Sequence, residues 1–473
     1  MAASRSHVRS QITWIAMMDL ACLLAGSAVG IVLRLGHEEM SEYVFHHLEG
    51  WLLLFGGVLL ANYLAGSYRV QYTFSRFNLV VTWIFSLIFA LLILSITSYA
   101  WFMIVLGRGV LLFSLASYSA LSLFLKLLVY RNLFRSDVFL CRTAIIGTGA
   151  RSLEMKRMVE NDLVLPAHKV VAHIRVSGGD RAEGGEESVL NGVAVLATDR
   201  ATLEAVVRSL SVSLIIVGME DMNGMHVIYQ ELRRLRFDGI EVLTPLSVAE
   251  IYRGITPLEL VNEEVLMQAS LESGLPMVWR MKRLSDIVIS VAGIILSLPF
   301  MVLMFILIKL SSPRDPVLYS QLRVGQFGKQ FRIYKLRTMR HGAETDSGPT
   351  WASRHDSRIT VLGRFLRRFR LDEVPQFFNI LRGEMSLVGP RPERPEMIAL
   401  LEKQVPFYSE RENILPGLTG WAQVRYPYGE SIEDAARKLE YDLYYMKHLS
   451  ISLDLQIILS TLRIVLFGKE RST

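Results

Sequence analysis

Two adjacent carboxylates, Asp372 and Glu373, are the residues of this sequence best suited to do chemistry. Pro375 follows them and suits the first turn of a helix, so the pair is expected at a helix N-terminus. That position favours ionised carboxylates and also attracts phosphate groups. An ionised carboxylate can act as a nucleophile. An Asp-Glu pair at a helix start is nevertheless most often a plain cap, so the pair alone leaves both interpretations open.

Basic residues gather on the N-terminal side of this pair. From Ser312 to Arg370 the sequence holds 13 Lys and Arg against 4 Asp and Glu. Such a block favours phosphates, nucleic acid or an anionic membrane surface. A solvated basic face is the ordinary alternative. Because this block lies between an apolar segment and the carboxylate pair, a functional role is the preferred interpretation.

Three cations are candidates for holding a phosphate group. Arg391 lies between two prolines, which fix the backbone around it, and its planar guanidinium can grip two phosphate oxygens at once. Lys335 and Arg337 are two residues apart on an expected strand, so they point to the same face and can bracket one diphosphate. An exposed strand face with no ligand is the alternative for these two residues.

Four apolar runs precede this region. The chain has 473 residues, which is room for two or three domains, and 51% of them are apolar, which indicates a membrane protein. A spanning helix needs about 20 residues, and the second run is short unless it begins near Tyr43. A bundle of four transmembrane helices is therefore expected in residues 1–135. The runs are Ile12–Leu33, Trp51–Ala65, Leu79–Ala100 and Val110–Tyr130.

Charged residues set the expected orientation of this bundle. Arg5 and Arg9 precede the first run, and Arg131 and Arg135 follow the fourth, whereas the loop after the first run is rich in glutamate. Basic residues favour the cytoplasmic side, so both ends of the bundle are expected there. Asp19 within the first run should face the bundle interior. A buried contact between helices, without a catalytic role, is its preferred interpretation.

Residues 136–271 have the alternating short strands and helices of a Rossmann-like α/β domain. The turn Gly147-Thr-Gly149 follows an expected strand and can hold a pyrophosphate at a helix N-terminus. Ser152 stands at the third glycine position of that motif, and a Tyr-x-x-x-Lys pair is missing from the sequence. A degenerate, structural domain is preferred to a ligand-binding one. The expected strands are Thr143–Gly147, Leu214–Gly218 and Ile240–Leu243.

The apolar run Ile287–Leu310 is long enough to span a membrane, but basic residues flank both of its ends. Ser297-Leu-Pro299 interrupts its middle, where proline removes a helical hydrogen bond. A helix over about residues 284–310 that enters the membrane, breaks near Pro299 and returns to the same face fits both features. An ordinary kinked fifth span is the alternative.

From Lys282 to the C-terminus the sequence resembles the bacterial sugar transferase family, the monotopic polyprenyl-phosphate hexose-1-phosphate transferases. The preceding modules resemble those of its larger members, such as undecaprenyl-phosphate glucose or galactose phosphotransferases. Each matching motif is weak alone, and their shared order makes the resemblance specific. The motifs are Lys282-Arg-Leu-Ser-Asp286, Ser297-Leu-Pro299, Gln321-Leu-Arg-Val-Gly325, Lys335-Leu-Arg-Thr-Met339, Gly363-Arg-Phe-Leu-Arg367, Leu371-Asp-Glu-Val-Pro-Gln376, Asn379–Pro392, Pro416-Gly-Leu-Thr-Gly-Trp421 and Tyr441-Asp-Leu-Tyr-Tyr445.

This resemblance implies a mostly helical monotopic catalytic domain over residues 272–473. It implies transfer of a hexose-1-phosphate from a UDP-sugar to undecaprenyl phosphate, which starts the repeat unit of an exopolysaccharide, a capsule or an O-antigen. Asp372 would form a covalent sugar-phosphate intermediate, and Glu373 would assist with the metal or with proton transfer. Oxygen ligands without a His or Cys cluster suit Mg²⁺, held by the two carboxylates. The family commonly has a small hydroxyl residue where this chain has Arg370, which leaves the local contacts open.

The resemblance also suggests binding residues and partners. Thr419 and Gln423 would help to hold the nucleotide. Lys282 and Arg283 would meet the phosphate of the lipid carrier or anionic lipid, while Ser297 and Pro299 would form the membrane turn. Expected partners are the UDP-sugar, undecaprenyl phosphate, membrane lipid and a second copy of the chain, without nucleic acid. The expected location is the bacterial inner membrane with all soluble parts in the cytoplasm. No motif distinguishes glucose from galactose.

Three other functions are weaker. A polysaccharide transporter or flippase would need more spans, with polar residues lining a path. A nucleotide-sugar oxidoreductase would need the missing glycine and the Tyr-x-x-x-Lys pair. A membrane-bound nucleic-acid binder would show the basic block interleaved with exposed aromatic residues, and it would leave the carboxylate pair unexplained.

Overall fold

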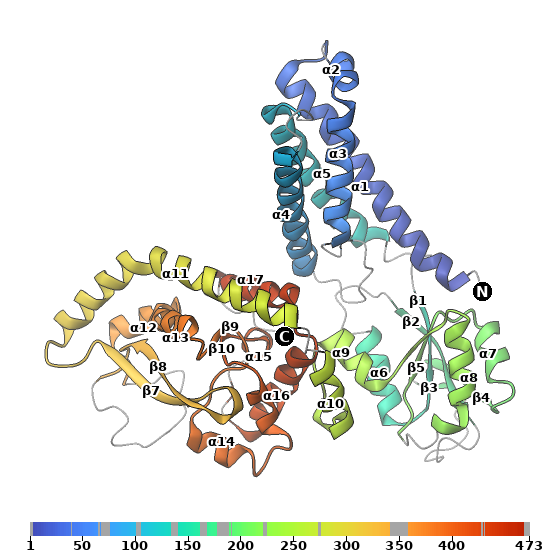
Figure 1. The fold of residues 1–473 in the computed structure, drawn as a ribbon. Coiled ribbons are helices and arrows are strands. Elements are labelled where there is room, and N and C mark those ends of the chain that lie inside the picture. Colours follow the sequence, from blue (N-terminus) through green and yellow to red (C-terminus); the bar gives the residue numbers. More distant parts are fainter. Residues whose placement is uncertain are drawn as a thin grey trace. The chain divides into compact units, whose positions relative to one another are not determined.

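The computed structural model divides the chain into two compact units, Met1–Arg253 and Gly254–Thr473 (Figure 1). The described residues are 3–38, 40–64, 67, 76–100, 106–133, 141–160, 168–176, 189–190, 192–220, 225–272, 276–340, 358–426, 429 and 431–467. Arg135 of the predicted cytoplasmic end of the bundle, and residues 341–357 of the basic block, lie outside the described residues.

The first unit begins with an apolar helical bundle. Small residues bring α1 and α5 close together: a Cβ atom on Gly26 or on Gly30 would lie 2.6 Å from a backbone nitrogen of α5. Glycine at these positions therefore permits backbone packing without a side chain between the helices. The helices are α1 (Ala3–Leu35), α2 (Met40–His46), α3 (Leu48–Leu64), α4 (Arg76–Ala100) and α5 (Arg108–Leu133).

A buried polar cluster joins the helices of the bundle. Asp19 of α1 is fully buried, and its Oδ1 lies 3.0 Å from Nζ of Lys126 on α5. Ser122 donates to the same carboxylate at 2.9 Å, and Asn62 of α3 donates to it at 3.2 Å. The prediction that Asp19 faces the interior is confirmed. Its charge is matched by a cation and two donors, as a buried charge in lipid requires.

Within the described residues, three helices are long and apolar enough to cross a membrane: Ile15–Leu35, Arg108–Leu128 and Pro276–Ser311. The helices α2 and α3 would make a fourth if counted as one span, although they meet at a bend of 80°. The predicted start of the second span near Tyr43 therefore falls in a separate helix. Four spans in the first 135 residues stay a prediction.

A six-stranded sheet follows, in the order β3-β4-β2-β1-β5-β6, and β3 alone is antiparallel to its neighbour. The three predicted strands are confirmed as β1, β5 and β6. The apolar runs of β1 and β5 reflect burial on both faces, which is usual for parallel strands covered by helices, whereas β6 at the edge of the sheet is partly buried. The elements are β1 (Cys141–Ile146), α6 (Ala150–Glu160), β2 (His168–Val176), β3 (Val189–Leu190), β4 (Val193–Thr198), α7 (Leu203–Ser209), β5 (Leu214–Val217), α8 (Met225–Phe237), β6 (Glu241–Leu243) and α9 (Pro245–Arg253).

The second unit begins before the boundary expected near residue 272, because its first segment packs on α16. Thr256 donates its backbone N–H to Glu440 O at 3.0 Å, and Trp421 donates to Gly254 O at 2.8 Å. The elements are η2 (Leu258–Leu260), α10 (Glu263–Glu272), α11 (Pro276–Ser311), β7 (Leu318–Val324), η3 (Gln326–Gly328), β8 (Gln330–Leu336), α12 (Val361–Arg368), η4 (Leu371–Gln376), α13 (Phe377–Arg382), β9 (Ser386–Val388), α14 (Pro395–Leu401), η5 (Tyr408–Asn413), β10 (Gly417–Thr419), α15 (Trp421–Arg425), α16 (Ile432–Lys447) and α17 (Ile451–Phe467).

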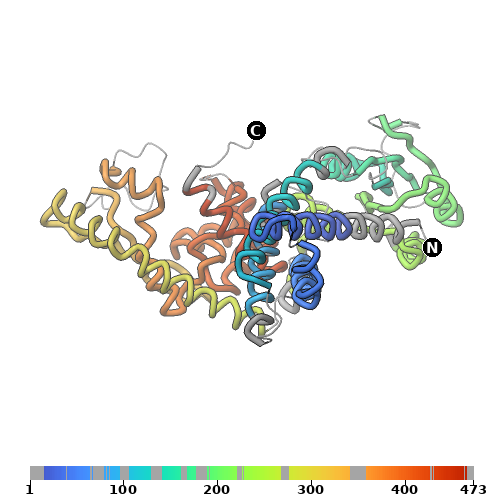
Figure 2. The backbone as a smooth tube through the Cα atoms, turned by 90° about the horizontal axis from the view of Figure 1, so that it is seen from above, coloured from blue at the N-terminus to red at the C-terminus, as the bar shows by residue number. Residues whose placement is uncertain are grey.

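The longest helix, α11, has 36 residues and runs unbroken along one edge of the second unit (Figure 2). The expected break near Pro299 is wrong as an interruption of helical structure, because Pro299 lies inside the helix. A proline in a helix interior removes one hydrogen bond and bends the axis when the flanking turns persist. The curve of α11 in Figure 1 fits this effect. Ser297 donates to Ile294 O at 3.3 Å in the turn before Pro299.

Both ends of α11 are anchored in the second unit. Asp286, near its start, accepts a hydrogen bond from the backbone N–H of Leu387 on β9 at 2.9 Å. Met304 and Ile308, near its end, are buried in a hydrophobic cluster with Leu336 of β8 and Leu366 of α12. The exposed apolar middle of α11 therefore lies between two points of attachment to one compact unit.

Candidate functional site

The carboxylate pair lies at the start of a helical segment, as predicted. Asp372 and Glu373 occupy the first turn of η4, and α13 continues directly from it. Arg370 precedes η4 with a left-handed backbone, at φ 53°, which turns the chain sharply after α12. Such a conformation costs a residue with a side chain about 1 to 3 kcal/mol. Pro375 lies within η4, where its fixed φ suits the helical turn.

Three cations surround Glu373. Its Oε1 lies 3.1 Å from Nζ of Lys335 on β8 and 3.2 Å from Nη2 of Arg391, and its Oε2 lies 3.6 Å from Nη1 of Arg370. Burial opposes the negative charge of Glu373. Lys335, Arg391 and Arg370 outweigh that effect and hold the pKa of Glu373 well below its ordinary value. Glu373 is therefore an ionised carboxylate that orders the cations around it.

Asp372 differs from its neighbour. It is also buried, but no cation among the described residues is in ion-pair contact with its carboxylate. Burial raises the pKa of Asp372, the charge of Glu373 raises it further, and Lys335 and Arg367 offset part of this. A carboxylate that is poorly solvated and not neutralised by an ion pair is a better nucleophile than one held by cations.

Among the described residues, Lys335 and Arg337 share no ion-pair partner. Lys335 contacts Glu373, and burial lowers the pKa of its ammonium while Glu373 opposes the shift. Arg337 lies just beyond β8, and its Nη1 is 3.1 Å from Oδ2 of Asp315. The expectation that both residues bracket one diphosphate is therefore not supported, because Arg337 already has an acidic partner elsewhere.

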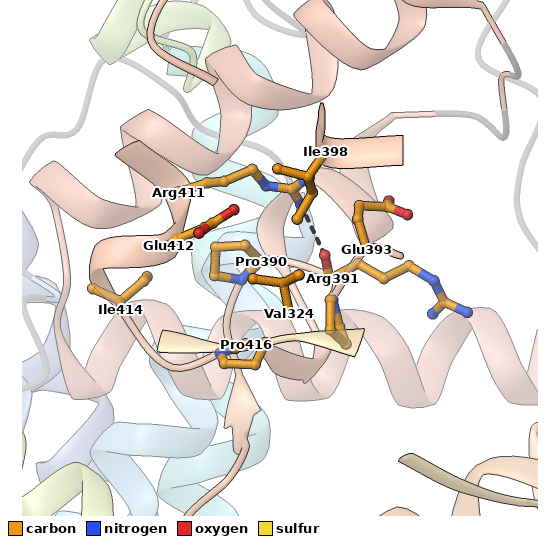
Figure 3. A pocket seen from close by; sticks show the side chains of 11 residues that line it. Val324, Pro390, Arg391, Glu393, Ile398, Arg411, Glu412, Ile414 and Pro416 are labelled. Atoms are coloured by element: carbon orange, nitrogen blue, oxygen red, sulfur yellow. Dashed lines mark hydrogen bonds between the residues drawn. The ribbon is translucent and has the colours of Figure 1, made fainter. Parts of the chain in front are cut away.

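The segment that carries Arg391 follows β9 and forms one wall of a small pocket (Figure 3). The N–H of Gly389 donates to Thr419 O at 2.9 Å, and the N–H of Gly417 donates to Pro390 O at 2.8 Å, so the segment is joined to β10. A Cβ atom on Gly417 would clash with the backbone of Gly389. The close approach of the two backbones thus requires glycine, and it fixes the position of the backbone that leads to Arg391.

The expected nucleotide residues lie beside this segment. Thr419 ends β10, and its hydroxyl is 2.6 Å from that of Thr461 on α17. Gln423 lies on the short helix α15 that follows. Thr419 holds Gly389 through its carbonyl, so its contact with the site is one of backbone support.

Lys282 and Arg283 are engaged with protein groups. The ammonium of Lys282 is buried and donates to Asp454 Oδ2 at 2.7 Å, to Val388 O at 2.9 Å and to Tyr445 OH at 3.0 Å. An ammonium has three donors, and all three are used, so the expectation that Lys282 meets a lipid phosphate is wrong. Arg283 donates to the carbonyls of Ile380 and Leu381, and it so caps the C-terminus of α13.

The two carboxylates fit a magnesium ion only together with substrate. No group of three or more His, Cys, Asp or Glu side chains in the described parts of the chain is arranged to hold a metal. Mg²⁺ is commonly held by one or two carboxylates, several waters and the phosphates of its substrate. Asp372 offers such a carboxylate, whereas Oε1 of Glu373 already contacts two cations.

The glycine-containing turn of the α/β domain is occupied by the protein itself. Oε1 of Glu220, just after β5, accepts a hydrogen bond from the N–H of Ala150 at 2.8 Å, at the first turn of α6. Arg151 in turn holds the carbonyls of Met219 and Glu220. A phosphate bound at this helix N-terminus would have to displace Glu220.

Comparison with known proteins adds independent information. Residues 277–468 match a family described as bacterial sugar transferase. A UDP-N-acetylgalactosamine-undecaprenyl-phosphate N-acetylgalactosaminephosphotransferase of Aeromonas hydrophila is 43% identical over 40% of this chain and 44% of its own length. An undecaprenyl-phosphate glucose phosphotransferase of Komagataeibacter xylinus is 32% identical over 70% of this chain and 60% of its own. The chain thus spans about half the length of these two relatives.

A shorter relative is matched over most of its length. A putative undecaprenyl-phosphate N-acetylgalactosaminyl 1-phosphate transferase of Bacillus subtilis (strain 168) is 45% identical over 28% of this chain and 72% of its own length. This chain thus matches about seven tenths of the length of a smaller protein.

Proposed function

Because this chain belongs to the bacterial sugar transferase family, we propose that it transfers a hexose-1-phosphate from a UDP-sugar to undecaprenyl phosphate. The names of its relatives support this reaction class. The observation that carries the proposal is the asymmetry of the pair: Glu373 is held by three cations, and Asp372 is not in ion-pair contact with any in the described residues.

The reaction proceeds in two displacements at the phosphorus that bears the sugar. An oxygen of the ionised Asp372 attacks this phosphorus, the bond to the bridging oxygen breaks, and UMP leaves with the bonding electrons. A phosphate oxygen of undecaprenyl phosphate then attacks the same phosphorus. The bond to Asp372 breaks, the carboxylate is regenerated, and undecaprenyl-diphosphate-sugar is released. Each step conserves charge without an oxidant or a reductant.

The surrounding residues have separate tasks in this reaction. Arg391 and Lys335 stabilise the negative charge that develops on the leaving phosphate, because both lie beside the pair and Arg391 offers a planar fork. Glu373 keeps these two cations in place. Mg²⁺ would be held by a carboxylate of the pair together with the diphosphate, and it would offset phosphate charge.

The attachment of both ends of α11 to one unit supports a re-entrant helix in the sense that both ends stay on one face of the membrane. About 33 Å of helix separates Asp286 from Ile308, so a straight crossing would put these two residues on opposite faces of the bilayer. Asp286 and Ile308 instead pack on the same compact unit. The catalytic unit then lies on one face of the inner membrane, the cytoplasmic face according to the basic residues of the sequence.

The remaining assignments complete the proposal. The parallel sheet of the first unit is a Rossmann-like domain with a structural role, which the position of Glu220 supports. The apolar bundle anchors the enzyme with four spans and favours a homodimer. The product starts a repeat unit of an exopolysaccharide, a capsule or an O-antigen.

The test is release of UMP by the purified full chain in nanodiscs with Mg²⁺, undecaprenyl phosphate and a panel of UDP-sugars. We expect turnover with one sugar, which identifies the substrate, and dependence of sustained turnover on the lipid phosphate. Absence of UMP release with every UDP-sugar would contradict the proposed function.

A further inference from the structure

The segment that carries Arg391 is held by hydrogen bonds at every carbonyl. Four successive carbonyls each accept a bond from a different donor. Two donors are backbone N–H groups, and the other two are guanidinium groups of buried or half-buried arginines. The bonds are Gly417 N to Pro390 O at 2.8 Å, Arg411 Nη2 to Arg391 O at 3.0 Å, Arg323 Nη1 to Pro392 O at 2.9 Å, and Val324 N to Glu393 O at 3.0 Å.

Arg411 is the donor that acts on Arg391 itself (Figure 3). Its guanidinium is buried and is surrounded by protein groups: Nη1 donates to Tyr408 OH at 2.6 Å, and Nη2 lies 2.9 Å from Oδ2 of Asp442 on α16. Asp442 is 2% exposed. Because both terminal nitrogens of the guanidinium contact these partners, Arg411 is oriented in one direction and its charge is matched inside the protein.

The geometry points to a positioning role: we propose that Arg411, oriented by Asp442 and Tyr408, fixes the backbone of Arg391 so that its guanidinium reaches the substrate diphosphate. This role rests on the proposed function, because phosphate transfer at the diphosphate is what requires a fixed position of Arg391. Pro392 confines the backbone of Arg391 to the extended region, within which its φ and ψ angles can still vary by about 40°. The hydrogen bond from Arg411 removes this remaining freedom at Arg391, whose guanidinium must be directed at the diphosphate.

A simple structural role for Arg411 makes a different prediction. In that case the buried pair with Asp442 would matter for folding, and its loss would act independently of Arg391. A positioning role instead requires the effect of Arg411 to pass through Arg391. Arg411→Lys keeps the positive charge for Asp442, but one ammonium on a flexible stem does not reproduce the planar fork.

The experiment is a double-mutant cycle on UMP release, with kcat and KM measured for wild type, Arg411→Lys, Arg391→Ala and the double variant. We expect Arg411→Lys to lower kcat/KM by about 10- to 100-fold, mainly through kcat. The double variant should be no slower than Arg391→Ala alone. Independent, multiplicative losses, or an Arg411→Lys enzyme as active as wild type, would overturn the positioning role.

Hydrogen exchange at the N–H groups of Gly389, Gly417 and Val324, which bond the segment to β10 and β7, provides a readout that does not need turnover. Exchange should be faster in Arg411→Lys than in wild type, and unchanged in Arg437→Ala, which removes an exposed arginine of α16 that pairs with the buried Glu440. If wild type releases no UMP, the proposed function fails while this measurement still decides whether Arg411 holds the segment. Equal exchange in wild type and Arg411→Lys would refute it.

Discussion

Two sites in this molecule have groups that could bind a phosphate, and the protein engages those groups differently. At the start of α6, the protein's own carboxylate, Glu220, takes the backbone N–H group that a phosphate would need. At the start of η4, the cations Lys335 and Arg391 gather on Glu373, while Asp372 beside it is in contact with no cation in the described residues. Glu220 therefore blocks the first site, whereas the second site keeps a carboxylate, Asp372, that can react.

The difference shows why a motif alone does not identify a phosphate site. The turn Gly147-Thr-Gly149 has the right spacing for a phosphate-binding motif and follows a parallel strand, yet Glu220 occupies the N–H group that a phosphate would need. The Asp-Glu pair would be an ordinary cap without the cations that the fold brings to it. In both cases the deciding residue comes from a distant part of the chain.

The largest effect is expected at the reactive carboxylate. Asp372→Asn keeps the size of the side chain and removes its negative charge, so UMP release should fall by at least about 1,000-fold. Thermal unfolding of the variant in nanodiscs should match that of wild type, since Asp372 holds no ion pair with a described residue. Normal turnover by this variant would place the reactive group elsewhere and remove the contrast with α6.

Removing Arg391 tests the cationic side of the comparison. Arg391→Ala should lower kcat by about 100- to 1,000-fold, the usual cost of losing a charge-stabilising donor in a transition state. Steady-state kinetics with the preferred UDP-sugar will measure it. Arg337→Ala is the matched control, because Arg337 pairs with Asp315 rather than with Glu373, and it should retain most of the activity. Equal losses in both variants would contradict the separation of the two arginines.

The pH dependence separates the roles of the two carboxylates. Activity requires ionised Asp372, so kcat/KM should fall as the pH drops through its pKa. Glu373 raises that pKa, and Lys335 lowers it. Glu373→Gln should therefore move the acid limb of the pH–rate profile to lower pH, and Lys335→Met should move it to higher pH. Shifts in the same direction for both variants would show that the acid limb of the profile reflects the ionisation of a group other than Asp372.

The smallest effect is expected at the closed site. Glu220→Ala removes the acceptor of the first N–H of α6 and should destabilise the α/β domain by about 1 kcal/mol, the typical cost of a lost N-cap. The rate of UMP release should stay unchanged. Chemical denaturation, followed by the loss of helical signal, measures the first quantity. A large gain or loss of turnover would mean that this site communicates with the reaction.

The sequence predicted the elements of the fold better than their contacts. Three strands, the buried position of Asp19 and the helical start at Asp372 follow from local patterns of apolar and capping residues. Pro299 was overinterpreted, because proline bends a helix as readily as it ends one. The strands β2 and β4 were not foreseen. Polar residues interrupt the apolar run of β2, and β4 is only partly buried.

The site was predicted in part. Lys335 and Arg391 were correctly grouped near the pair, because their motifs resemble those of the family. Lys282 was misjudged, since its partner Asp454 lies 172 residues away and sequence alone gives no sign of that contact. Glu220 and Arg411 were missed for the same reason. A buried charge finds its partner through tertiary packing, which no local pattern records.

The central claim is that Asp372 carries the sugar phosphate during the reaction, and mass spectrometry tests it most directly. The full chain is incubated with Mg²⁺ and the preferred UDP-sugar without undecaprenyl phosphate, quenched in acid and digested. The account predicts stoichiometric UMP and a peptide with Asp372 heavier by the mass of a hexose phosphate, which disappears when undecaprenyl phosphate is added. An unmodified Asp372 in an enzyme that turns over normally once the lipid is supplied would contradict it.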